Sequence, residues 1–147
     1  MERPAGAVYL YERAPDGRFQ PGGVLSAGAA QSGDLFGHAI AFEGDDLLVG
    51  APGERSAARG IGGRETGNVD ASGAAYLFTR QGGTWHEVTR IKAPEPATKE
   101  AFGNAVALGG AELLFVGASQ DANGGSGVNA MQGQRTAPAS GAVHVFR

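Results

Sequence analysis

Phe36-Gly37, Gly50-Ala51-Pro52 and Ser72-Gly73-Ala74 follow one another in this order before residue 75. The same order returns as Phe102-Gly103, Gly117-Ala118-Ser119 and Ser140-Gly141-Ala142. Corresponding residues are about 67 positions apart, so one structural unit recurs in register. A repeating unit rarely carries a unique catalytic site, because catalysis needs unlike residues that converge.

The composition of the 147-residue chain limits the class of protein to which it can belong. Hydrophobic residues make up 41%, which is enough for a core, but glycine contributes 26 residues and the aromatic fraction is only 7%. So many glycines without a strict period of three predict tight turns rather than collagen. The 12 basic and 15 acidic residues form no basic stripe, so we expect no nucleic-acid partner.

The sequence contains no cysteine, which excludes a disulfide framework and a thiolate metal site. No apolar run approaches the ~20 residues of a membrane span, so we expect no membrane insertion. We expect residues 1–4 not to be a signal peptide. We expect the chain to be a piece of a longer protein.

Apolar runs within each unit have the length of strands rather than helices. The runs at 47–49 and 74–78 are apolar at consecutive positions, so both faces of these strands need to be covered. A more polar segment, Thr84 to Ala93, closes the unit, and its charges suit an exposed edge strand. No segment between the runs has the 3.6-residue period of a helix, which favours antiparallel neighbours. Four such strands describe a blade of a β-propeller, and we predict an all-β fold.

We assign residues 1–147 to a single β-propeller segment of about two blades plus partial strands. Residues 1–30 supply strands three and four of a preceding blade. Residues 34–93 form a complete blade, and residues 100–147 supply strands one to three of the next. Propellers have roughly four to eight blades. We therefore expect either a fragment of a larger propeller or a unit that forms a homo-oligomer through exposed blade faces.

Three ordered motifs carry a resemblance to a known repeat: Asp34-Leu35-Phe36-Gly37-His38-Ala39-Ile40-Ala41, Asp46-Leu47-Leu48-Val49-Gly50-Ala51-Pro52 and Ser72-Gly73-Ala74-Ala75-Tyr76-Leu77-Phe78. They resemble the FG-GAP repeat of the β-propellers of integrin α-subunits, and most closely that of bacterial secreted and cell-surface proteins. The resemblance implies a seven-bladed propeller in the parent protein and a secreted or cell-surface location. It also implies ligand binding by loops on one face.

No enzyme signature is present in the sequence. His38, His86 and His144 fall in different segments without shared acidic neighbours, and no G-x-S-x-G motif occurs. We therefore expect a non-enzymatic extracellular module for adhesion, which binds a protein or a glycan through its loops. The alternative is an accessory propeller domain of a secreted hydrolase.

Calcium is the one cofactor for which the sequence offers candidate ligands. Integrin-type repeats often hold it between strands one and two, but here residues 43–46 and 109–112 are too short to supply six to eight oxygens. In the longer loop between strands two and three, Glu54 and Asp121 occupy the same place in the two units. One interpretation is that these carboxylates accept hydrogen bonds from loop N–H groups.

The other interpretation is a cation site in the second of these loops. Asp121, Asn123 and Asn129 offer oxygens at positions one, three and nine of a calcium-type loop. Position six is Ser126, where such loops prefer glycine, and the corresponding segment around Glu54 offers little to match. Apart from this site, we expect no cofactor.

Overall fold

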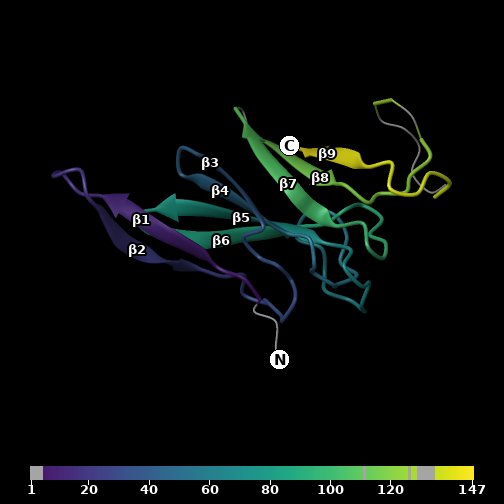
Figure 1. Ribbon diagram of the computed structural model, residues 1–147, viewed down its shortest axis with the longest axis horizontal. Coiled ribbons are helices and arrows are strands. Elements are labelled where there is room, and N and C mark those ends of the chain that lie inside the picture. The colour runs from purple at the N-terminus through teal and green to yellow at the C-terminus, as the bar shows by residue number, and fades with distance from the viewer. Residues whose placement is uncertain (1–4, 111, 126, 129–134) are drawn as a thin grey trace.

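The computed structural model describes residues 5–110, 112–125, 127–128 and 135–147, which form three antiparallel sheets (Figure 1). The described residues contain nine strands and no helix. The strands are β1 (Val8–Arg13), β2 (Phe19–Leu25), β3 (Ala39–Glu43), β4 (Asp46–Ala51), β5 (Ala74–Gln81), β6 (Thr84–Ile91), β7 (Phe102–Gly109), β8 (Leu113–Ala118) and β9 (Ala142–Phe146).

The sheets follow the chain in order along the molecule (Figure 1). β1 and β2 form the first sheet, β3 to β6 the second, and β7 to β9 the third, and every neighbouring pair is antiparallel. The all-β prediction is confirmed, and the second sheet has the four strands of a propeller blade. The assignment of all three sheets to one domain stays a prediction.

Two apolar clusters lie between the sheets. The first includes Val8 from the first sheet together with Val49 and Tyr76 from the second. The second joins Leu48 of the second sheet to Val116 of the third. Because successive side chains of a strand point to opposite faces, the neighbours Leu48 and Val49 fill different clusters. This explains the consecutive apolar residues, since the second sheet is covered on both faces.

The two Phe-Gly pairs attach each sheet to the one before it. Phe36 is 3% exposed and Phe102 is fully buried. The backbone N–H of Phe36 donates to the carbonyl of Ala5 at 2.8 Å, and that of Phe102 donates to the carbonyl of Ser72 at 3.0 Å. The ring of Phe36 meets that of Tyr76 edge-on at 5.6 Å, an arrangement favoured by aromatic quadrupoles. Both phenylalanines therefore pack between sheets.

Gly50 lies where β4 passes close to the third sheet. A Cβ atom at Gly50 would come within 2.0 Å of the carbonyl oxygen of Gly103. Gly103 itself has a φ of 89°, a conformation that residues with a side chain rarely adopt. The sequence motif suggests that Gly50 permits a sharp exit from its strand, whereas the structure shows that it permits contact between sheets.

Candidate functional site

The loop between β4 and β5, residues 52–73, is anchored at its base by Ser72. The Ser72 hydroxyl donates to the carbonyl oxygens of Glu54 at 3.4 Å and Ser56 at 3.3 Å. The N–H of Gly73 also donates to the carbonyl of Glu54, at 2.9 Å. Ser72 is fully buried, so water does not compete for these bonds.

The equivalent contacts occur in the loop between β8 and β9. The Ser140 hydroxyl donates to the carbonyl oxygens of Asp121 at 3.1 Å and Asn123 at 3.0 Å. The N–H of Gly141 donates to the carbonyl of Asp121 at 3.0 Å. The repeated serine therefore fixes the entry and exit of both long loops.

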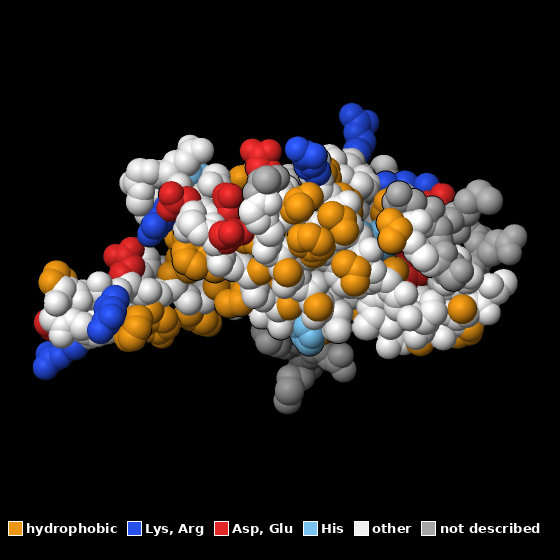
Figure 2. Space-filling model, turned by 90° about the horizontal axis from the view of Figure 1, so that it is seen from above, with side chains coloured by type: hydrophobic (Ala, Val, Ile, Leu, Met, Phe, Trp, Pro, Cys, Tyr) orange, Lys and Arg blue, Asp and Glu red, His pale blue; other side chains and the backbone are white. Residues whose placement is uncertain are grey.

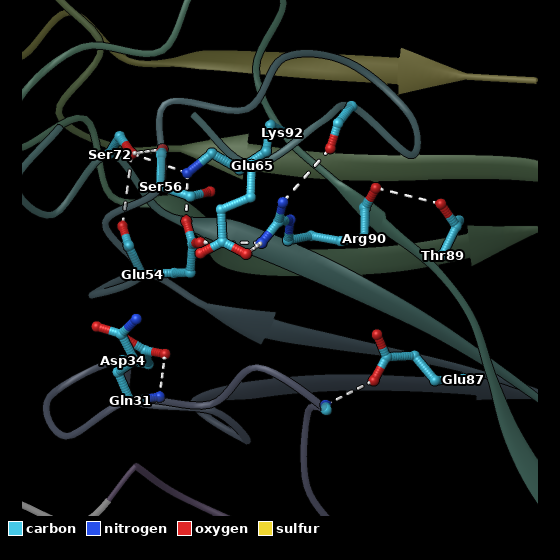
Figure 3. Close-up of polar contacts among 12 residues, drawn as sticks. Gln31, Asp34, Glu54, Ser56, Glu65, Ser72, Glu87, Thr89, Arg90 and Lys92 are labelled. Atoms are coloured by element: carbon cyan, nitrogen blue, oxygen red, sulfur yellow. Dashed lines mark hydrogen bonds and ion pairs between the residues drawn. The ribbon is translucent and has the colours of Figure 1, made fainter. Parts of the chain in front are cut away.

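Behind the first loop lies a buried ion pair between Lys92 and Glu54 (Figure 3). Lys92, directly after β6, is fully buried and Glu54 is 4% exposed. The Lys92 ammonium donates to the Glu54 carboxylate and, at 2.8 Å, to the hydroxyl of Ser72. Burial lowers the pKa of Lys92, and the hydrogen bond to Glu54 opposes that shift.

Arg90 adds a second cation to this group. Its guanidinium Nη1 forms ion pairs with the carboxylates of Glu54 and Glu65, each at 3.5 Å (Figure 3). Its Nη2 donates to the carbonyl of Gly63 at 3.4 Å. We call Glu54, Glu65, Ser72, Arg90 and Lys92 the charge cluster. Two carboxylates face two cations in it, and of these four groups only Glu65 is exposed.

The loop also covers the end of β6. The N–H of Lys92 donates to the carbonyl of Gly60 at 3.0 Å, and the N–H of Gly62 donates to the carbonyl of Arg90 at 2.8 Å. The sequence interpretation of residues 84–93 as an exposed charged edge is therefore wrong at its C-terminal end. Lys92 turns inward because Glu54 supplies the opposite charge. Lys92 stands between the apolar residues Ile91 and Ala93, and this is the sequence signal that indicates its burial.

A small polar hollow of about 40 Å³ lies beside the charge cluster, and Asp34, Ser56, Glu65 and Asn68 are among the residues that line it. The Asp34 carboxylate accepts a hydrogen bond from the N–H of Gln31 at 2.7 Å. Burial raises the pKa of Asp34. The Ser56 hydroxyl is buried without a hydrogen-bond partner among the described residues. The hollow has room for one small polar group.

Asp121 and Asn123, two of the three predicted cation ligands, bond to the backbone of their own loop. Asp121 Oδ1 accepts from the N–H of Asn123 at 2.7 Å, and Asn123 Oδ1 accepts from the N–H of Gly125 at 3.2 Å. Asp121 Oδ2 lies 3.7 Å from Nε2 of His144. These contacts follow the first interpretation of the loop, in which the acidic side chain caps backbone N–H groups.

The third predicted ligand, Asn129, lies outside the described residues. Among the residues that are described, no group of three or more histidine or acidic side chains is placed to hold a metal ion. The cation site at Asp121, Asn123 and Asn129 stays a prediction. Calcium calorimetry on the native chain and on Asp121→Ala tests it: binding heat that the variant lacks would support the site.

The three histidines lie on separate elements. His38 precedes β3, His86 is in β6 and His144 is in β9, where its ring lies 5.3 Å from that of Phe102. A helix that could span a membrane is absent from the residues that the structure describes.

Comparison with known proteins identifies the repeated unit. A search of curated proteins found no match. The family model for the FG-GAP repeat matches residues 23–78 and 85–146, which include both Phe-Gly pairs and both serine-anchored loops up to β5 and β9. The chain therefore belongs to the FG-GAP repeat family.

Proposed function

We propose that this chain is a non-enzymatic β-propeller module of a secreted or cell-surface protein, and that it binds a protein or a glycan through the loop at residues 52–73. The observation that carries the proposal is the contrast between the base and the tip of this loop. The base is fixed by Ser72, Glu54 and Lys92, whereas Arg64, Glu65 and Asn68, which we call the tip, are exposed. A rigid base with exposed polar side chains is the usual design of a binding loop.

The chemistry of the tip suits a polar ligand. Arg64 supplies fixed guanidinium donors, Glu65 supplies acceptors, and the Asn68 amide supplies both. The adjoining polar hollow accommodates one hydroxyl or similar group, with Ser56 as a free hydrogen-bonding partner within the described part. Sugars and polar peptide side chains offer groups of this kind.

The burial of Ser72 and Lys92 supports the non-enzymatic part of the proposal. Their side chains lie 2.8 Å apart, as a nucleophile and its base would. Both are fully buried beneath the loop, so a substrate has no access to the hydroxyl. We assign this pair to the support of the loop rather than to catalysis.

Binding measurements on the purified chain test the proposal. The native chain is applied to an array of glycans and to immobilised extracellular matrix proteins, and bound ligands are titrated with Arg64→Ala and Asn68→Ala. We expect each variant to weaken binding about tenfold or more. Arg18→Ala, which removes an exposed side chain at the turn between β1 and β2, is the matched control. Absence of binding by the native chain, or equal loss in the control, would overturn the proposal.

A further inference from the structure

Three strands occupy equivalent positions in the three sheets. β1, β5 and β9 each begin one or two residues after a glycine that starts the same six-residue pattern: Gly6 to Tyr11, Gly73 to Phe78 and Gly141 to Phe146. Val8, Ala75 and Val143 therefore share one position, and Tyr9, Tyr76 and His144 share the next. Because side chains alternate along a strand, the first set points to one face of its sheet and the second set to the other.

Burial of these residues shows which faces are covered. In β5 both faces are covered, since Ala75 is fully buried and Tyr76 is 2% exposed. In β1, Val8 is 8% exposed but Tyr9 is 67% exposed. In β9 the pattern is reversed, because His144 is 9% exposed and Val143 is 68% exposed. The first and third sheets thus each have one uncovered face. In the first sheet it is the face at the Tyr76 position, and in the third sheet it is the face at the Ala75 position.

The uncovered face of the first sheet, which we call the N-terminal face, consists of Tyr9, Tyr11, Phe19 and Val24. Each is more than half exposed, and Tyr9 lies directly across from Val24 in the strand pair. Residues opposite each other on neighbouring strands share a face, so this group forms one apolar surface. Figure 2 shows hydrophobic side chains at the surface at the β1–β2 end of the molecule.

The uncovered face of the third sheet, which we call the C-terminal face, consists of Ala105, Ala107, Val143 and Val145. All four are exposed. Beside them lies an apolar hollow of about 430 Å³, partly lined by Gly117.

The position that corresponds to this hollow in the second sheet, beside Gly50, is filled by the third sheet. At Gly50, the equivalent of Gly117, an added Cβ would lie 2.0 Å from the next sheet. At Gly117 the nearest atom would be the Cβ of Ala105, 3.4 Å away and in the same sheet. The C-terminal face therefore has the shape of a surface that receives another sheet.

We propose that the N-terminal face of one copy of this chain binds the C-terminal face of a second copy. The chain itself contains two contacts of this kind. In the first, Val8 of β1 shares a cluster with Tyr76 and Phe78 of β5. In the second, Ala75 of β5 shares a cluster with Phe102, and Phe146 of β9 packs against it. Each contact sets aliphatic residues against rings.

The two uncovered faces carry the same two kinds of surface as these internal contacts, one aliphatic and one with aromatic rings. Val143 and Val145 stand at the positions of Ala75 and Leu77, and Tyr9 and Tyr11 stand at those of Tyr76 and Phe78. The eight named residues of the two faces are uncharged, whereas Arg13, on the same side of β1 as Tyr9 and Tyr11, lies opposite Phe19 at the end of the strand pair and donates to the carbonyl of Gly17. The N-terminal face has no Phe-Gly pair to enter the hollow. We therefore expect the contact between copies to be weaker than the contacts within the chain.

The contact is heterologous, because two different surfaces meet. Such contacts build rings or open chains rather than symmetric pairs. Changing one face blocks one end of each molecule and leaves the other end intact. This property separates the proposed contact from any association of like surfaces.

Analytical ultracentrifugation of the purified chain tests the proposal, from about 1 µM to about 1 mM. We expect the average mass to rise with concentration for the native chain and to stay at the monomer value for Val143→Glu and for Tyr9→Glu. An equimolar mixture of the two variants should form a dimer, since each keeps one intact face. Val88→Glu, at an exposed position of β6 outside both faces, should associate like the native chain.

Three results would overturn the proposal: a native chain that stays monomeric at about 1 mM, variants that associate alone, or variants that fail to combine when mixed. Circular dichroism confirms that each variant is folded. If either unfolds, Val145→Glu and Tyr11→Glu repeat the test on the same faces. A monomeric native chain would leave both faces to a different partner.

Discussion

The ammonium group of Lys92 donates a hydrogen bond to the carboxylate of Glu54, and the two side chains are 0% and 6% exposed. Removing both charges from water is unfavourable, and their attraction offsets this only when further bonds satisfy the remaining donors and acceptors. Ser72 and Arg90 supply those bonds. The pair therefore ties the end of β6 to the loop between β4 and β5.

Removing either partner should strongly destabilise the fold. We expect Lys92→Met and Glu54→Leu to lower the free energy of unfolding, measured in urea, by about 3–5 kcal/mol. Glu54→Leu should have the larger effect. After Lys92→Met, the carboxylate keeps Arg90 at 3.5 Å, whereas after Glu54→Leu the ammonium keeps only the Ser72 hydroxyl among its described contacts.

The double variant Lys92→Met/Glu54→Leu separates the pair from its surroundings. Apolar replacements for a buried ion pair are often neutral or stabilising, so we expect it to recover most of the lost free energy. A loss in the double variant equal to the sum of the two single losses would show that the two groups do not depend on each other.

Phe36 should contribute strongly to stability, because its ring is 3% exposed and meets both Tyr76 and Phe78 edge-on. We expect Phe36→Ala to lower the free energy of unfolding by about 3–5 kcal/mol. Phe19→Ala, at a position that is 70% exposed, should change it by less than about 0.5 kcal/mol. A loss below about 1 kcal/mol for Phe36→Ala would contradict its place between the sheets.

Gly50 and Gly117 offer a matched comparison of the same change at equivalent positions. A methyl group at Gly50 would meet the carbonyl oxygen of Gly103 at 2.0 Å, so we expect Gly50→Ala to lower the free energy of unfolding by about 3 kcal/mol or to prevent folding. At Gly117 the nearest atom is 3.4 Å away, and Gly117→Ala should change it by less than about 1 kcal/mol. Similar losses at both sites would rule out close sheet contact as the reason for Gly50.

The strands and their order are predictable from the sequence because the information is local. The consecutive apolar residues at 47–49 and 74–78 specify strands covered on two faces, and the recurring Phe-Gly pair sets the period. Burial of Phe36 follows from the same pattern. The family match confirms the repeat that these segments predict.

The charge cluster is not predictable in the same way, because its members come together only through the fold. Glu54 lies in a loop and Lys92 follows the fourth strand of the sheet, so no spacing in the sequence links them. Repetition gives no help either. Asp121 stands at the position of Glu54, but its buried neighbour is His144 and not a lysine. The role of Gly50 was missed for a similar reason, since its close contact is with Gly103 of another sheet.

Asp34 should make the stability of the protein depend on pH. Burial raises the pKa of its carboxyl above the ordinary value of 3.8 in the folded state. Between 3.8 and that higher pKa, the folded protein keeps a proton that the unfolded chain has lost, so folding becomes less favourable as the pH rises through this window. Asp34→Asn keeps an acceptor for the N–H of Gln31 but does not ionise. We therefore expect its free energy of unfolding, relative to the native chain, to increase with pH across the window in urea titrations. Phe19→Ala, which removes no ionisable group, should show a constant difference, and a constant difference for Asp34→Asn would refute the assignment.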